Sequence, residues 1–315
     1  MNTTVKFTNG VEMPQLGLGT WLSKPEEIRT SVEAALANGY KLIDTATLYE
    51  NEAEIGEVLQ KHFKDGSLKR EDIFLTTKLW CTSNRECDVE PALRESLKRL
   101  QLDYVDLYLV HIPGSMTADW QHDKQTTLLD TWKGMEGVYQ KKLTRAIGLS
   151  NVSLKQIQNV MDHGKVPVHN VQNECNILLQ QDAIFDYCLS KGITFTSYAS
   201  LTSPGRRAYT ALEWKEDPAV LDQKSSELFT IAERVGKSNA QVLLKWLLKR
   251  GICVIPKSVN PARVKENCSL FDFDLTADDI TKINTQMNRQ RIFLHEFLIG
   301  HPEDPYVDER EPVKA

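Results

Sequence analysis

Short apolar segments alternate with longer amphipathic segments along almost the whole chain. Eight of the short segments are rich in the apolar and β-branched residues that are typical of buried strands. They are Leu16–Thr20, Leu42–Thr45, Phe74–Lys78, Leu107–His111, Ala146–Ser150, His169–Glu174, Thr194–Ala199 and Cys253–Ile255. The segments between them are too long for hairpins, so we expect the eight strands to lie parallel to one another.

The longer segments carry apolar residues at helical spacing. The clearest helices are predicted at residues 25–38, 88–100, 153–164 and 239–250. Pro25 lies in the first turn of the first helix and Gly39 follows its end, and these are common start and stop signals of a helix. The repeated order of strand and helix indicates an α/β fold.

Eight is the number of parallel strands at which such a sheet closes into a barrel, so we predict one (β/α)8 TIM-barrel domain over residues 1–315. The main alternative is an open doubly wound sheet, whose nucleotide site usually shows GxGxxG after the first strand. The corresponding segment here, GLGTWL, has only Gly17 and Gly19. The barrel is therefore the favoured prediction.

Three segments lie outside the strand and helix pattern. Residues 1–13 predict an N-terminal β-hairpin, because Asn9-Gly10 is the dipeptide that type I′ turns favour. The segment Ser203–Leu221 is long and poorly periodic, as functional loops often are. Residues from about 290 to 315 form a separate C-terminal tail.

Composition and charge narrow the class of partner. The chain is 41% hydrophobic and 26% charged, which is ordinary for a globular protein, and its formal net charge is −5 without a dense block of Lys and Arg. We therefore expect a small-molecule partner, and neither a nucleic acid nor a membrane. The N-terminus lacks the pattern of a secretory signal, so a cytoplasmic location is expected. The six cysteines have no CxxC spacing and no HExxH occurs, so no metal site is predicted.

Four side chains of different chemistry lie at the ends of three neighbouring strands. Asp44 and Lys78 end the second and third strands, His111 ends the fourth, and Tyr49 follows Asp44 closely. Each alone has an ordinary explanation, such as a structural ion pair, a helix cap or core packing. Active sites of such barrels lie at the carboxyl ends of the strands, however, and all four residues are expected at that rim.

Together these four groups suit the reduction of a carbonyl group. The reaction needs a hydride and a proton, and a phenol with a pKa of about 10 is a weak proton donor at neutral pH. The Lys78 ammonium would lower the pKa of Tyr49, and Asp44 would keep Lys78 charged. A neutral His111 would orient the carbonyl oxygen. We therefore predict that Tyr49 donates the proton.

From Val5 to Met287 the chain resembles the aldo-keto reductases, and the blocks that carry the resemblance are LGLGTW, LIDTATLYENEAEIG, TTKLWC, LYLVHIP, IGLSN and VIPKSVNPARVKENC. The resemblance implies that Asp44, Tyr49, Lys78 and His111 form the catalytic tetrad. It also implies a cofactor site, in which Ser150, Asn151 and Gln172 contact the nicotinamide carboxamide and Tyr198 stacks on its ring. Lys257, Ser258 and Arg263 would bind the 2′-phosphate, and Glu266 and Asn267 would contact the adenine. Ser200 and Leu201 are the remaining residues of the implied cofactor site.

Two cations and a hydroxyl group favour a phosphate monoester over a bare ribose hydroxyl, so the expected cofactor is NADPH. The same segment also predicts a helix start, with Ser258 or Asn260 as the cap and Pro261 in the first turn.

The resemblance implies a substrate pocket lined by Trp21, Leu48, Trp80 and Ile112, with the C-terminal tail over the active-site face. Ile112 stands where the family often has Trp or Phe, which predicts a pocket that is wider on one wall unless Phe293 or Phe297 of the tail fills it.

Two other functions stay open at this point. One is a non-catalytic NADPH-binding barrel with a regulatory or structural role, and the other is an aldolase that uses Lys78 as a Schiff base. A monomer that acts on a small carbonyl compound is the expected form.

Overall fold

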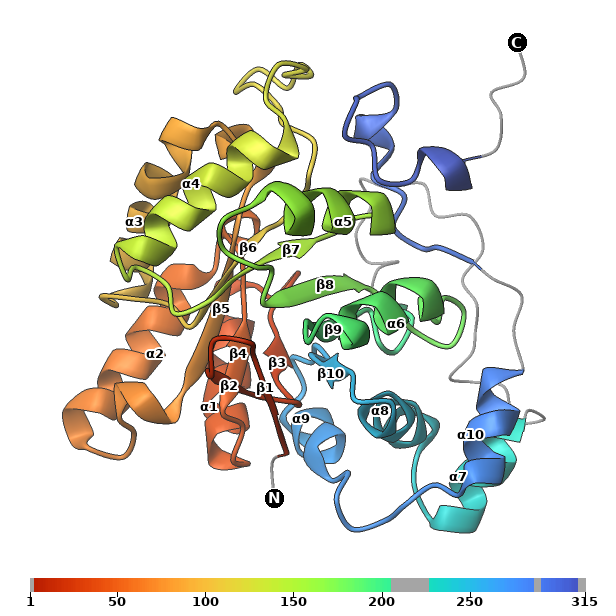
Figure 1. The fold of residues 1–315 in the computed structure, drawn as a ribbon. Coiled ribbons are helices and arrows are strands. Elements are labelled where there is room, and N and C mark those ends of the chain that lie inside the picture. The colour runs from red at the N-terminus through yellow and green to blue at the C-terminus, as the bar shows by residue number, and fades with distance from the viewer. Residues whose placement is uncertain (1–2, 205–226, 286–289, 311–315) are drawn as a thin grey trace.

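A closed barrel of eight parallel strands forms the centre of the molecule (Figure 1). The computed structural model describes residues 3–204, 227–285 and 290–310. The strands are β3 (Leu18–Gly19), β4 (Leu42–Asp44), β5 (Phe74–Leu79), β6 (Leu107–Val110), β7 (Ile147–Ser150), β8 (Asn170–Glu174), β9 (Thr194–Tyr198) and β10 (Cys253–Val254). The Gly17 N–H donates to the Val254 carbonyl over 2.9 Å and closes the ring. The predicted (β/α)8 barrel is confirmed, and all eight predicted strands are present.

Helices cover the outside of the barrel (Figure 1). They are α1 (Pro25–Ala37), α2 (Glu52–Asp65), α3 (Glu86–Leu100), α4 (Leu128–Gln140), α5 (Leu154–His163), α6 (Asp182–Ser190), α7 (Glu227–Val235), α8 (Asn239–Lys249), α9 (Pro261–Cys268) and α10 (Ala277–Asn284). Ser153 and Ser238 cap α5 and α8 through capping boxes with Gln156 and Gln241. The four helices predicted from apolar spacing are all found.

The N-terminal hairpin closes the bottom of the barrel. β1 (Thr4–Lys6) pairs antiparallel with β2 (Glu12–Pro14), and Phe7 and Met13 are buried against the lower barrel interior. The hairpin is confirmed, but the predicted turn type is wrong. The Gly10 N–H donates to the Phe7 carbonyl over 2.9 Å, and Gly10 alone of the turn residues has a positive φ, +87°. A type I′ turn needs positive φ at both central residues, whereas here a tight turn is followed by a left-handed glycine.

The C-terminal segment from 290 to 310 crosses the carboxyl ends of the strands. It contains the short 3-10 helices η5 (Glu296–Leu298) and η6 (Val307–Glu309). His122 Nε2 contacts the Phe297 carbonyl at 2.8 Å, and His301 Nε2 contacts the Ser115 carbonyl at 3.1 Å. The segment therefore lies over the active-site face, and we call residues 290–310 the cap.

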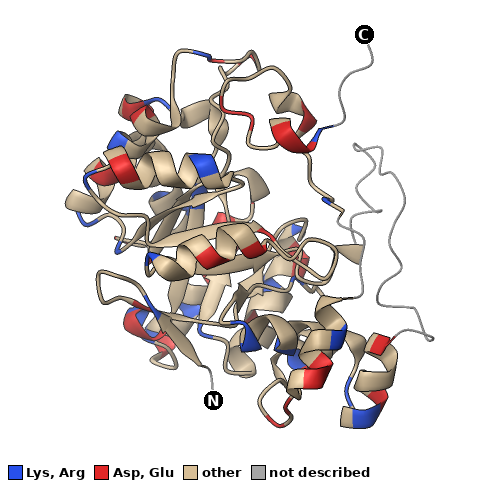
Figure 2. Cartoon of the chain, turned by 45° about the vertical axis from the view of Figure 1, so that its right-hand side comes forward, with Lys and Arg blue, Asp and Glu red and all other residues tan. Residues whose placement is uncertain are grey.

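The predicted functional loop at 203–221 lies almost wholly outside the described residues, which break off at 204 and resume at 227. Within the described ranges, no helix is both long and apolar enough to cross a membrane. Figure 2 shows acidic and basic residues interspersed over the outer helices, with mostly uncharged residues along the strands. This distribution fits a barrel with charged outer surfaces and an apolar interface between strands and helices.

Two glycines give a matched test of barrel packing. A Cβ added at Gly148 in β7 would lie 2.2 Å from the Asn170 carbonyl oxygen of β8, whereas one added at Gly137 in α4 meets nothing within 4 Å. We expect Gly148→Ala to reduce the free energy of unfolding by about 1 to 3 kcal/mol or more. Gly137→Ala should increase it by about 0.5 to 1 kcal/mol. Urea unfolding followed by circular dichroism checks both, and equal shifts would contradict the close packing of β7 on β8.

Candidate active site

The buried ammonium of Lys78 joins three of the four predicted catalytic residues. Its Nζ forms an ion pair with Asp44 Oδ1, donates to the Thr45 carbonyl over 2.9 Å and lies 3.3 Å from the Tyr49 hydroxyl. Lys78 and Asp44 are almost completely buried. Burial alone would lower the pKa of Lys78, but Asp44 and then Tyr49 raise it above its usual value. The side chain is therefore an ammonium ion at neutral pH.

Local structure explains why these groups meet. Asp44 ends β4, and Lys78 lies one position before the end of the neighbouring strand β5. Tyr49 ends the 3-10 helix η1 (Thr47–Tyr49), which follows β4 directly. Gln172 of β8 reaches across the barrel and donates to the second oxygen of Asp44 over 2.7 Å. Both carboxylate oxygens of Asp44 are therefore hydrogen-bonded, as a buried charge requires.

The environment of Tyr49 differs from the prediction. Burial raises the pKa of the Tyr49 phenol above 10, and the nearby Lys78 charge opposes this shift without reversing it. Lys78 lowers this pKa, as predicted, but burial of the ring outweighs its effect, and the sequence did not show that burial. The phenol therefore keeps its proton at neutral pH.

His111 follows β6 and is 8% exposed. Its ring stands edge-on to Tyr49 and Trp80, with centroids 5.6 and 5.3 Å apart. Burial, and then the Lys78 charge, lower the pKa of His111 well below 6.5, so the imidazole is neutral. Its Nδ1 is buried and has no hydrogen-bond partner among the described residues.

The residues assigned to the nicotinamide lie together at the ends of β7, β8 and β9. Asn151 has a left-handed backbone, and its Nδ2 donates to the His111 carbonyl over 2.9 Å and to Ser150 Oγ over 3.1 Å. The Tyr198 hydroxyl donates to Asn151 Oδ1 over 2.5 Å. Because Gln172 also contacts Asp44, this amide cluster adjoins the Lys78 site directly.

The loop after β9 has an unusual backbone. Ser200 is buried and its Oγ lies 2.7 Å from Ser197 Oγ, while Leu201 packs against the main core. Ala199, Thr202 and Ser203 all have φ between +50° and +60°. The left-handed region is uncommon for residues with side chains, so this loop is held by its surroundings.

The residues assigned to the phosphate and adenine lie at the start of α9 and along it. Lys257 and Arg263 are exposed, and Ser258 is buried. Asn260 is the N-cap, since its Oδ1 accepts the Ala262 N–H over 2.9 Å. Two cations beside a helix N-terminus are well suited to a phosphate group. Farther along α9, Glu266 accepts a hydrogen bond from Ser238, and Asn267 is buried.

The predicted pocket residues separate into two groups. Trp21, Leu48 and Trp80 are at least partly exposed near the site. Ile112 is 1% exposed and packs in a cluster with Cys81, Met116 and Leu298, against Trp80 and Phe297. The cap therefore fills the space beside Ile112. Phe297, one of the two tail residues predicted to do so, packs against this cluster.

Sequence reasoning missed two features near the mouth of the site. Trp120 is 50% exposed, and its ring lies 6.1 Å from Trp80 and 5.8 Å from Phe297 between centroids. Glu174, two residues after Gln172, is fully buried and contacts the cap. Trp120 lies in a loop without periodicity. Its residue type, a large aromatic side chain in a polar segment, is therefore the one sequence feature that could have indicated a role at the site.

Comparisons with known proteins find relatives along nearly the whole chain. A family model described as "Aldo/keto reductase family" matches residues 15–287. "Aldo-keto reductase family 1 member A1-A" of Danio rerio is 39% identical, with 99% of this chain and 98% of the relative covered. The Schistosoma japonicum aldose reductase structure has a TM-score of 0.87 and 37% identity, and covers 98% of this chain and 100% of that one. A Bombyx mori aldo-keto reductase in complex with NADP has a TM-score of 0.88 and 33% identity, with 97% and 99% covered.

The neutral state of His111 predicts a pH dependence of stability. Its pKa in the folded protein lies below the usual 6.5, so the unfolded chain binds one more proton in acid. Stability is therefore fully present above about pH 6.5 and is lost as the pH falls. We expect His111→Gln to reduce the slope of unfolding free energy against pH, between about pH 6 and about pH 5, by up to about 1.4 kcal/mol per unit. Urea titrations at several pH values test this, and an unchanged slope would contradict a neutral, buried His111.

Proposed function

The chain belongs to the aldo/keto reductase family, and from that premise we propose that it reduces aldehydes and ketones with NADPH, with Tyr49 as the proton donor. The enzyme class follows from the family, namely NADP-dependent oxidoreductases that act on carbonyl groups. The contact of the Lys78 ammonium with both Asp44 and Tyr49 is the observation that supports the role of Tyr49 best.

The proton would come from a phenol that is neutral in the resting site. When the Tyr49 O–H bond breaks, a negative charge forms 3.3 Å from the Lys78 ammonium, which stabilises it. Asp44 keeps Lys78 charged and fixed in place, and Gln172 holds the second carboxylate oxygen. The proton goes to the carbonyl oxygen, and the hydride goes to the carbonyl carbon. Bound NADPH would supply this hydride.

His111 would orient the substrate. A neutral imidazole donates through one nitrogen only, so it offers a directed hydrogen bond to a carbonyl oxygen without adding a charge to the site. The ring already stands against Tyr49, so one oxygen could contact both groups. A short, aimed contact of this kind lowers the entropic part of the barrier.

The residues present fit the cofactor. The amide and hydroxyl groups of Ser150, Asn151 and Gln172 suit a carboxamide, and the Tyr198 ring lies beside them. Lys257 and Arg263 would bind the 2′-phosphate at the start of α9, with Ser258, while Glu266 and Asn267 would face the adenine. Ser200 and Leu201 would border the connecting part of the cofactor. Different donor groups would therefore bind the nicotinamide end and the 2′-phosphate end of the cofactor.

The aldolase alternative finds no support in the site. A Schiff-base lysine must lose its proton before it attacks a carbonyl, and such lysines have a lowered pKa. The pKa of Lys78 is raised, and its Nζ is surrounded by three oxygen atoms in the buried interior. Lys78 is therefore better suited to stabilise a neighbouring anion than to act as a nucleophile.

Replacement of Tyr49 by Phe tests the proton donor. We expect Tyr49→Phe to lower kcat for a small aldehyde by about 100-fold or more, since general acid catalysis commonly contributes that much. NADPH affinity, measured by quenching of tryptophan fluorescence, should stay within about twofold because the phenol is not assigned to the cofactor. Tyr187→Phe on α6 removes a phenol oxygen outside the site and serves as the control. Turnover near the wild-type value in the Tyr49 variant would refute the assignment.

A second pair of substitutions tests the phosphate site. Lys257→Met combined with Arg263→Ala should weaken NADPH by at least about tenfold per residue, because hydrogen bonds to charged groups contribute roughly 1.5 to 3 kcal/mol each. NADH affinity should change little, since it lacks the 2′-phosphate. Lys133→Met with Arg94→Ala makes the same charge change on α4 and α3 as a control. Equal losses for NADPH and NADH would exclude the phosphate role.

A further inference from the structure

Glu174 is a buried carboxylate that the proposed proton transfer does not use. It is the last residue of β8 and is fully buried. Residues two positions apart in a strand face the same side, so Glu174 lies on the face of β8 that carries Gln172. A carboxylate at such a place needs hydrogen-bond donors, because an unpaired buried charge is strongly destabilising.

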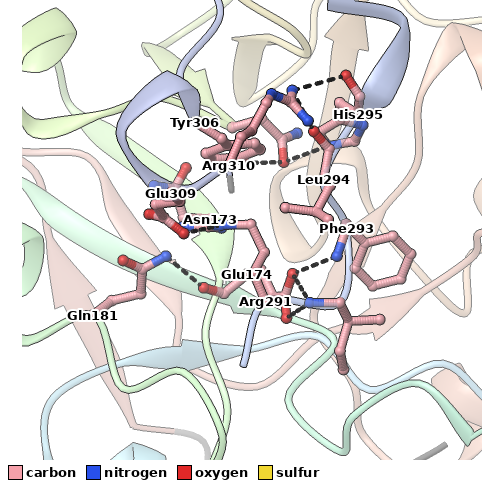
Figure 3. A network of polar contacts seen from close by, with 12 residues as sticks. Asn173, Glu174, Gln181, Arg291, Phe293, Leu294, His295, Tyr306, Glu309 and Arg310 are labelled. Carbon is pink, nitrogen blue, oxygen red and sulfur yellow. Dashed lines mark hydrogen bonds and ion pairs between the residues drawn. The ribbon is translucent and has the colours of Figure 1, made fainter. Parts of the chain in front are cut away.

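The main chain of the cap supplies these donors (Figure 3). The Ile292 N–H donates to Glu174 Oε1 over 2.8 Å and to Oε2 over 3.1 Å, and the Phe293 N–H donates to Oε2 over 2.8 Å. Asn176 Nδ2 lies 3.4 Å from Oε1. Burial raises the pKa of Glu174, and the Arg291 charge and these main-chain N–H groups oppose that shift. Three N–H···O contacts to one carboxyl group therefore clamp the cap at residues 292 and 293.

The cap is braced internally, so the clamp acts on more than two residues. Arg291 pairs with Glu309 at 2.7 Å and lies 3.9 Å above the centre of the Tyr306 ring. Arg310 pairs with Asp304 at 2.8 Å and donates to the Leu294 carbonyl over 2.8 Å. These contacts tie the beginning of the cap to its end, as Figure 3 shows.

The clamped segment also presents an aromatic ring to the site. Phe293 packs edge-on against Trp21 and against Tyr198, with centroids 5.5 and 5.6 Å away. Trp21 is the proposed pocket wall and Tyr198 the proposed partner of the nicotinamide ring. The position of the Phe293 main chain therefore determines where the Phe293 ring lies between Trp21 and Tyr198.

We propose that Glu174 is a positioning residue for the substrate, which holds the cap by its main chain and so fixes Phe293 as an apolar wall for aromatic and other apolar aldehydes. This inference rests on the proposed reductase function. Because the clamp binds backbone N–H groups, it does not depend on which side chains the cap carries at 292 and 293. The clamp therefore determines where the cap is attached, whereas the side chains of the cap determine the shape of the pocket.

Glu174→Gln tests the clamp, because it keeps the shape but removes the charge and one acceptor oxygen. We expect hydrogen exchange in the peptide containing Ile292 and Phe293 to become about 10- to 100-fold faster. The KM for benzaldehyde should rise about 3- to 10-fold, as for the loss of one aromatic contact, with kcat within about twofold. Glu296→Gln removes the same charge from an exposed cap position and should change neither quantity.

Ile292→Pro removes one donor from the cap without touching the barrel strand, and it should raise the KM for benzaldehyde in the same way. This variant decides the question if Glu174→Gln does not fold. Unchanged exchange or an unchanged KM, or equal effects in the Glu296 control, would overturn the proposal, and so would a fall in kcat at constant KM. If the wild-type protein reduces no aldehyde, the proposed function fails, whereas the exchange experiment still reports on the clamp.

Discussion

The ammonium of Lys78, enclosed in the barrel, is the constraint on which the site depends. A charge at that depth is tolerated only with close, oriented partners. Asp44 from β4, the Thr45 carbonyl and the Tyr49 hydroxyl provide them, and Gln172 from β8 completes the shell around Asp44. Satisfying one buried charge thus fixes the relative positions of three strands and the short helix η1.

The barrel and the cluster of Asp44, Tyr49, Lys78 and His111 were predictable for a common reason. Both follow from local patterns combined with one geometric rule, that parallel strands bring their carboxyl ends to one rim. Apolar segments located the strands, and the polar residues at their ends located the site. The helix start at Asn260 was equally local, because a cap and a proline stand next to each other in the chain.

What the sequence did not show depends on contacts between distant segments. The pKa of Tyr49 rises because several elements exclude water from its ring, and no short stretch records this. Ile112 is covered by Leu298, which follows it by 186 residues in the chain, so the sequence around Ile112 does not show its burial. The hairpin turn type was missed for a local reason, since Asn-Gly is compatible with more than one turn.

Burial leaves the proposed site with a single compensated ion pair and two neutral groups. Desolvation raises the pKa of Tyr49 and lowers that of His111, so both groups are uncharged, while Lys78 and Asp44 are paired. Proton donation by Tyr49 would then create one new charge, 3.3 Å from the Lys78 ammonium. The same exclusion of water that makes the phenol a weak acid at rest strengthens this attraction as the proton leaves. The cap that closes over the strands is therefore part of the electrostatic environment of the proposed reaction as well as a wall of its pocket.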